Sequence, residues 1–118
     1  ILQKCNMQKD DIIRLRHMLD AAKAAVSFIR GRDRASLDND QQKIFALEKA
    51  VEIIGEAAIK LSKECRADLP QIPWAKIISM RNRLIHAYFD INLDILWKTA
   101  VEDAPMLIAE LEKIIPQE

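Results

Sequence analysis

One stretch of the chain, residues 80–89, places polar side chains within an otherwise apolar helical pattern. Read as a helix, its apolar residues and those just before it share one buried face, and Arg81 falls in the middle of that face. Burying a guanidinium without partners costs on the order of several kcal/mol. We therefore expect Arg81 either to be paired or to face a pocket that binds an anion. The apolar residues of this face are Trp74, Ile77, Ile78, Leu84, Ile85 and Tyr88.

His86 is the second reactive side chain of this stretch. It follows Arg81 by five residues, so the two side chains point about 140° apart around a helix, whereas Asn82 and His86 are neighbours one turn apart. One helix alone therefore does not bring Arg81 and His86 into one site. We expect a second wall from another helix or from the same helix of a second subunit, and a symmetric pairing of this kind predicts a homodimer.

The composition is typical of one helical domain. The chain has 118 residues, 50% of them hydrophobic, with only two glycines and four prolines, which favours helices over a sheet of short strands. We expect one all-α domain over residues 7–118, because a helical pattern begins just after Met7; residues 1–6 are either an upstream extension or a remnant of cloning. Eighteen basic and eighteen acidic residues leave no net charge, so any nucleic-acid contact must be local.

The spacing of apolar residues predicts long helices joined by short links, which is typical of an up-and-down antiparallel bundle of four to five helices. Gly31 is expected to end the first helix, Pro73 to begin the third, and Asn92 or Asp94 to cap the fourth. The predicted helices are residues 8–30, residues 36 or 38 to about 66 with a break near residue 39, residues 74–88, and residues 92–114 with a kink or break at Pro105.

Gly55 interrupts the longest apolar seam, that of the second helix. A glycine inside a helix costs about 1 kcal/mol relative to alanine, and a neighbouring helix that crosses closely at this point is the simplest reason for it. Glu56 follows on the polar side, four residues before Lys60. We favour a solvated surface position for Glu56 over a catalytic role.

The remaining candidate residues give weaker signals. Arg32 and Arg34 lie in the basic segment 30–36, either a solvated turn or an edge that contacts phosphate or a partner. His17 is assigned no role. Cys5 and Cys65 stand far apart without other ligands at metal-binding spacing, so we expect reduced thiols and no metal site. No apolar run approaches the roughly 20 residues that span a bilayer and no leader is visible, so we expect a cytoplasmic protein without a membrane segment.

The run from Arg81 to Tyr88 resembles the motif of HepT-type toxins of the HEPN superfamily: an arginine, four residues, a histidine, one residue and a tyrosine. An arginine and a histidine at this distance arise easily by chance. Three further segments, however, resemble the same family in order and spacing, and the resemblance covers nearly the whole chain from Met7. They are residues 53–58 (IIGEAA), 72–74 (IPW) and 93–97 (LDILW).

The resemblance implies a dimeric helical bundle with two copies of the motif near the subunit interface, and RNA cleavage without a metal or other cofactor. Such cleavage needs a group that moves a proton at the 2′-hydroxyl or the leaving oxygen, and a cation that stabilises the charged phosphorane. His86 would be the general acid/base and Arg81 the phosphate clamp. Asn82 would orient the His86 ring or the substrate, and Arg83 is a further candidate contact for RNA or a partner.

Tyr88 is the candidate for regulation. It follows Arg81 by seven residues, which on a helix means about 20° around the axis and roughly 10 Å along it, so we expect its hydroxyl at the mouth of the same cleft. In the family that the motif resembles, the matching tyrosine accepts adenylyl groups from ATP through a minimal nucleotidyltransferase antitoxin encoded beside the toxin. The resemblance thus implies that adenylylation of Tyr88 silences the nuclease, because a phosphodiester beside Arg81 occupies the anion site.

Two other classes of function remain open from the residues alone. The chain is alternatively a non-catalytic dimeric module that uses Arg81 to bind a nucleotide or a partner's phosphate. It is otherwise an inactive dimeric helical scaffold, with a structural Arg81 and a satisfied His86 at the interface. An RNA cleavage assay with and without a chelator separates these interpretations.

Overall fold

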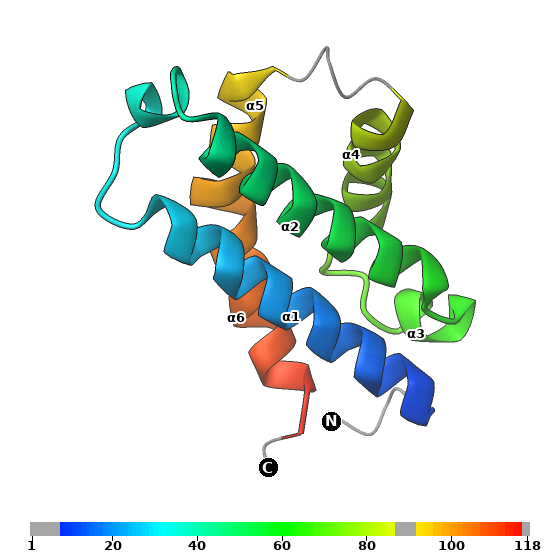
Figure 1. Ribbon diagram of the computed structural model, residues 1–118. Helices are drawn as coiled ribbons and strands as arrows, with labels where there is room; N and C mark the ends of the chain where they lie inside the picture. The colour runs from blue at the N-terminus through cyan, green and yellow to red at the C-terminus, as the bar shows by residue number, and fades with distance from the viewer. Residues whose placement is uncertain (1–7, 87–91, 117–118) are drawn as a thin grey trace.

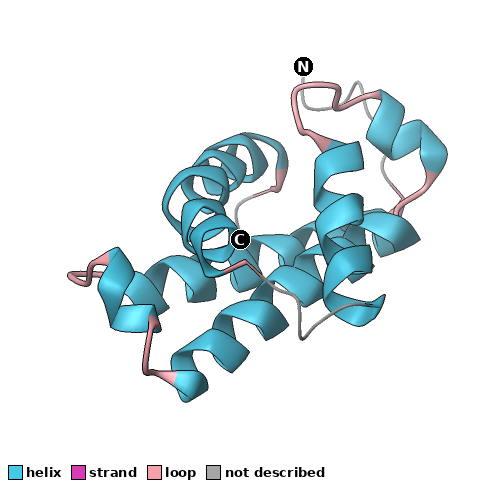
Figure 2. Ribbon diagram, turned by 90° about the horizontal axis from the view of Figure 1, so that it is seen from above, coloured by secondary structure: helices cyan, strands magenta, loops and turns pink. Residues whose placement is uncertain are grey.

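The computed structural model describes residues 8–86 and 92–116, and every regular element in that part of the chain is helical (Figure 2). This confirms the predicted all-α bundle. A 3₁₀ turn at Arg34–Leu37 precedes α2, and a π-helical turn at Thr99–Asp103 joins α5 to α6. The helices are α1 (Lys9–Ile29), α2 (Gln41–Lys60), α3 (Lys63–Ala67), α4 (Trp74–His86), α5 (Leu93–Lys98) and α6 (Ala104–Ile114).

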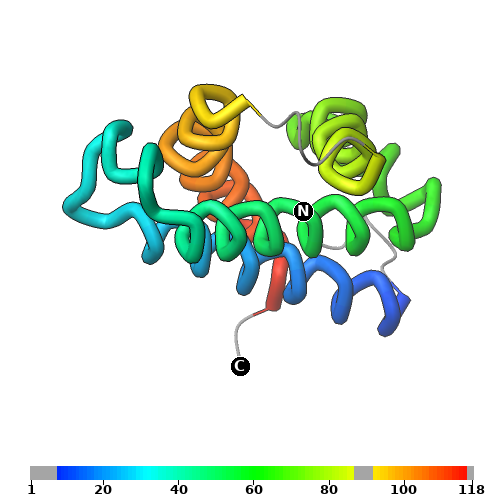
Figure 3. The backbone as a smooth tube through the Cα atoms, turned by 45° about the horizontal axis from the view of Figure 1, so that its top comes forward, coloured from blue at the N-terminus to red at the C-terminus, as the bar shows by residue number. Residues whose placement is uncertain are grey.

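Helices α1 and α2 run antiparallel, side by side, and form one layer of the molecule (Figure 1). Their facing stripes, including Leu15 and Met18 of α1 and Leu47 of α2, are completely buried. On the other side of this pair lie α4 and the α5–α6 segment, with their upper ends well separated (Figure 3). The core is therefore the space between the α1–α2 pair and the two segments that cross it.

The chain reverses after α1 at Gly31, as predicted. Gly31 has a φ of +73°, a conformation that a glycine adopts without steric cost. Helix α2 begins at Gln41, later than the start predicted at residue 36 or 38, and its cap is Asp40, which accepts a hydrogen bond of 2.9 Å from the Lys43 N–H. The break expected near residue 39 is present between the 3₁₀ turn and α2.

The second predicted helix ends earlier than expected, at Lys60 rather than near residue 66. The cause is Ser62, whose Oγ accepts a hydrogen bond from the Cys65 N–H and so begins α3. Asp11 of α1 holds this junction: its carboxylate accepts hydrogen bonds from Ser62 N–H (3.0 Å) and Ser62 O–H (2.8 Å). Asp11 is only 5% exposed, and these two bonds offset part of the cost of burying its carboxylate.

Helix α4 packs mainly against α2 and is poorly covered elsewhere. Pro73 directly precedes it, and its carbonyl accepts the Ile77 N–H at 3.1 Å. Leu84, 6% exposed, is the one buried residue among those described in α4. Ile77 and Ile78, expected on a buried face, are only partly buried, and Tyr88 lies outside the described residues.

Asn92 caps α5, as predicted, by accepting hydrogen bonds from the N–H groups of Asp94 (2.8 Å) and Ile95 (3.2 Å). The expected break at Pro105 is also confirmed, because the π-helical turn ends just before it. Proline supplies no N–H to the preceding turn, so a regular α-helix cannot continue through this point without a lost hydrogen bond. None of the described helices combines the length and the apolar character needed to cross a membrane.

Candidate active site

The site begins at the crossing of α2 and α4, where Gly55 lies against Arg81. A Cβ atom added at Gly55 would overlap the Arg81 Cβ and stand 2.7 Å from its Cγ and 3.3 Å from the Ile77 carbonyl oxygen. Only a residue without a side chain therefore fits at this crossing. The close helix contact that the sequence predicted at Gly55 is confirmed, and it fixes where the Arg81 side chain starts.

The Arg81 guanidinium extends from this crossing with an incomplete set of partners. Its Nη1 donates a hydrogen bond of 3.0 Å to Asn82 Oδ1, and its Nη2 lies 3.9 Å from Glu56 Oε2. Its Nε is buried and has no hydrogen-bond partner among the described residues. The Arg81 side chain is 25% exposed, so part of it is accessible to an anion, although the unpartnered Nε itself is buried.

His86 occupies a different surface, an open groove along the outer face of α4. The groove has a volume of about 560 Å³ and a mostly apolar floor. Asn82 lines this groove and also bonds to Arg81, so it connects the two parts of the site. The lining residues are Ala75, Ile78, Ser79, Asn82, Arg83 and His86.

The structure therefore keeps Arg81 and His86 on different faces of α4, as the helix geometry predicted. It brings Arg81 together with Asn82 and Glu56, and it brings His86 together with Asn82 and Arg83. The sequence did not predict that Glu56 would lie beside Arg81, because the spacing of Glu56 to Lys60 indicated a solvated pair. Gly55, its neighbour in sequence, was the signal that this turn of α2 meets another helix.

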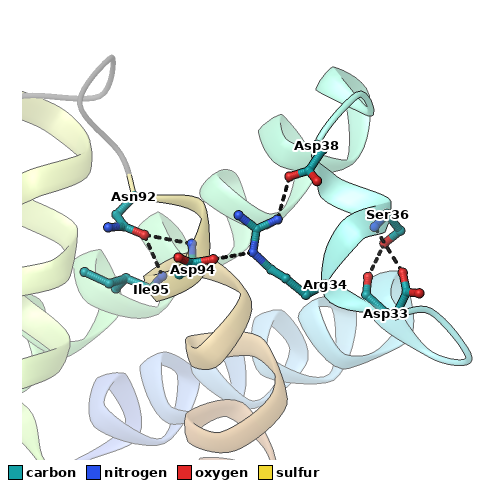
Figure 4. A network of polar contacts seen from close by, with 7 residues as sticks. All are labelled: Asp33, Arg34, Ser36, Asp38, Asn92, Asp94 and Ile95. Atoms are coloured by element: carbon teal, nitrogen blue, oxygen red, sulfur yellow. Dashed lines mark hydrogen bonds and ion pairs between the residues drawn. The ribbon is translucent and has the colours of Figure 1, made fainter.

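Arg34 lies far from this site in sequence and is engaged elsewhere (Figure 4). Its guanidinium bonds to Asp38 at 2.8 Å and to Asp94 at 2.6 Å, which ties the 3₁₀ turn to the start of α5. The hydrogen bonds from Asp38 and then Asp94 raise the pKa of Arg34 above its ordinary value. Arg32 is exposed, just after α1 in the segment that leads to α2. For both arginines the contact with RNA or a partner stays a prediction.

The chemical groups at the α4 surface include an imidazole, an amide, a hydroxyl and two guanidiniums. Such a set can move a proton and hold a phosphate. Among the residues that the structure describes, no three His, Cys, Asp or Glu side chains gather in a way that could hold a metal ion.

The chain matches the family described as "Ribonuclease HepT-like" over residues 18–114. It is 43% identical over 75 residues to a "Probable ribonuclease HepT" of Thermococcus cleftensis, a match that covers 64% of this chain and 68% of the relative. No solved structure matches the chain significantly.

Longer matches connect the chain to two further proteins. It is 35% identical over 95 residues to a "Putative RNase" of Methanocaldococcus jannaschii, with 80% of this chain and 87% of the relative covered. It is 33% identical over 104 residues to a "Putative RNase" of Caldanaerobacter subterraneus, with 88% and 93% covered. The matched family segment takes in the whole α2–α4 crossing and the α4 groove, and the chain belongs to the HepT-like ribonuclease family.

Proposed function

We propose that this protein is a metal-independent endoribonuclease toxin in which Arg81 clamps the scissile phosphate and His86 moves the proton. In the reaction, the ribose 2′-oxygen attacks phosphorus, the bond to the 5′-oxygen breaks, and a proton passes from the 2′-hydroxyl to the leaving oxygen. The products are a 2′,3′-cyclic phosphate and a free 5′-hydroxyl. Membership of a ribonuclease family supports the reaction class.

The observation that carries this proposal is the incomplete hydrogen bonding of the Arg81 guanidinium. Its guanidinium has a buried Nε without a partner, one hydrogen bond to an amide oxygen and a long, half-exposed contact with Glu56. A contact of that kind between exposed groups contributes little stability. A phosphate oxygen would accept hydrogen bonds from the Nη groups of the guanidinium and neutralise its charge, and a phosphorane carries more negative charge still.

The experiment that tests the proposal is cleavage of an end-labelled RNA by the purified protein, in the presence and in the absence of a chelator. We expect the same rate under both conditions. Dependence of the rate on a divalent cation would exclude this mechanism. RNA that is bound tightly but never cut would instead support the non-catalytic binding module.

We further propose that two copies of α4 face each other in a homodimer. The support is the weak cover of α4, where only Leu84 is buried in the described part, together with the separation of Arg81 and His86 on one chain. A two-fold pairing would place the His86 groove of one subunit near the Arg81 of the other.

This pairing predicts a stable dimer in solution. Analytical ultracentrifugation at micromolar concentration should give about twice the chain mass of 13.5 kDa. Replacing the half-buried Ile78, which lines the groove, with Glu should shift the population toward monomer and lower cleavage with it. A fully folded, active monomer would contradict the pairing.

Regulation is proposed through Tyr88, which the motif places just beyond the last described residue of α4. We propose that a minimal nucleotidyltransferase antitoxin transfers adenylyl groups from ATP to the Tyr88 hydroxyl, with release of pyrophosphate. The added phosphodiester would compete with RNA for the cation at Arg81.

Coexpression with such a nucleotidyltransferase should add one or more adenylyl masses to a peptide that contains Tyr88 and should silence cleavage. The variant Tyr88→Phe lacks the accepting oxygen, so we expect it to stay unmodified and active. Intact-mass and peptide mass spectrometry measure both results. Full neutralisation beside an unmodified Tyr88 would mean that the antitoxin acts by binding alone.

A further inference from the structure

Ser79 differs from the other hydroxyl residues of the described chain. Four of them donate a hydrogen bond within the protein: Ser27, Ser36, Ser62 and Thr99. The Ser79 hydroxyl makes no hydrogen bond to any described residue, although a serine within a helix commonly bonds to the carbonyl one turn earlier. In the single chain it is exposed and lines the α4 groove, and in the proposed dimer this groove is the shared cleft, so both its donor and its acceptor face the space in which RNA would bind.

The position of Ser79 relates it to the residues proposed for cleavage. It precedes His86 by seven residues, which corresponds to about 20° around the helix and roughly 10 Å along it. It also lies one turn before Asn82 and Arg83, within the same groove. A line of polar groups thus runs along α4, made of Ser79, Arg83 and His86. If the cleaved linkage of a bound RNA lies at His86, a neighbouring nucleotide of the same RNA lies at Ser79.

We propose that Ser79 is a substrate-binding residue that hydrogen-bonds the ribose 2′-hydroxyl of a nucleotide next to the cleaved linkage. The inference rests on the proposed ribonuclease function and adds a contact to it. A ribose hydroxyl lies beside the backbone phosphate, and Arg83 provides a cation for that phosphate one turn from Ser79. The 2′-hydroxyl both donates and accepts, as the serine hydroxyl does, and it is the group that distinguishes RNA from DNA.

The first test uses a short oligoribonucleotide with one cleaved linkage and places a single 2′-deoxy substitution at each of its positions in turn. Besides the nucleotide whose 2′-oxygen attacks, we expect one neighbouring position at which the substitution lowers kcat/KM of the native protein by about three- to tenfold. Ser79→Ala should lower kcat/KM on the all-ribose substrate by the same factor and should be insensitive to that substitution. Equal sensitivity in the native protein and the variant would overturn the assignment.

The second test measures binding independently of cleavage. In the His86→Ala background, fluorescence anisotropy should show that a labelled oligoribonucleotide binds about three- to tenfold tighter than its deoxy counterpart, and Ser79→Ala should remove most of that preference. Ser27→Ala on α1 is the matched control, since its hydroxyl bonds to the Ala24 carbonyl instead of facing the groove.

The two tests distinguish a failure of the Ser79 contact from a failure of the proposed catalysis. A native protein that cuts no RNA yet shows a Ser79-dependent ribose preference would refute the proposed catalysis and keep the Ser79 contact. A protein that cuts RNA normally, with a preference unchanged by Ser79→Ala, would refute the Ser79 contact alone. If Ser79→Ala weakened the binding of RNA and of DNA by the same factor, the Ser79 contact would also be refuted, because it would then lie on phosphate or base.

Discussion

Replacing His86 with Ala should lower the rate of RNA cleavage by about 10²- to 10⁴-fold, because a positioned general acid/base contributes an effect of that size. His86 is exposed in the α4 groove, so its removal should leave helical content and thermal stability nearly unchanged. The measurement is the single-turnover rate on an end-labelled RNA, with circular dichroism as the check on folding. Products of the native protein should carry the cyclic phosphate and the free 5′-hydroxyl.

The chain provides a matched control, since His17 is its only other histidine and is also exposed on a helix. His17→Ala should cleave at the native rate. Arg81→Ala and Arg81→Lys should both be impaired, the latter because an ammonium lacks the planar pair of donors that a guanidinium offers to phosphate. Cleavage that survives the loss of His86 would rule out its role as acid/base.

Replacing Gly55 with Ala should destabilise the protein and disable the site together. Within a helix this change ordinarily stabilises by about 1 kcal/mol. Here the new Cβ would overlap the Arg81 Cβ, so α4 must move away from α2. We expect the free energy of unfolding to fall by about 1–3 kcal/mol, the usual effect of overpacking, and cleavage to fall because Arg81 moves with α4. Urea unfolding and the single-turnover assay measure the two effects.

Gly31 provides the comparison for this prediction. Nothing lies within 4 Å of a Cβ added there, but its φ of +73° makes Ala strained by about 1–2 kcal/mol. Gly31→Ala should therefore lose a similar amount of stability and keep the native rate of cleavage at a temperature where it is folded. A Gly55→Ala protein with native stability and activity would show that the helices adjust at this crossing without moving the guanidinium.

The sequence by itself determined the helices and most of their ends, and its resemblance to a known family supplied the residues of the proposed site. Local pattern is enough to locate the turn at Gly31, which follows from its dihedral preference, and the start of α5, which follows from the side-chain cap of Asn92. It also locates the break before α6, because Pro105 has no N–H. The angle between Arg81 and His86 likewise follows from their spacing on one helix.

Tertiary structure decided which residues those side chains meet. The junction after α2, where Ser62 begins α3, is held by Asp11, which is 51 positions away from Ser62 in sequence. The partner of Arg81 depends on where α4 crosses α2, and that crossing places Glu56 beside the guanidinium although its spacing had favoured Lys60. Periodicity reports which face of a helix is buried, but not the point at which another helix crosses it. That point is set by the packing of side chains from distant segments, and no local pattern contains it.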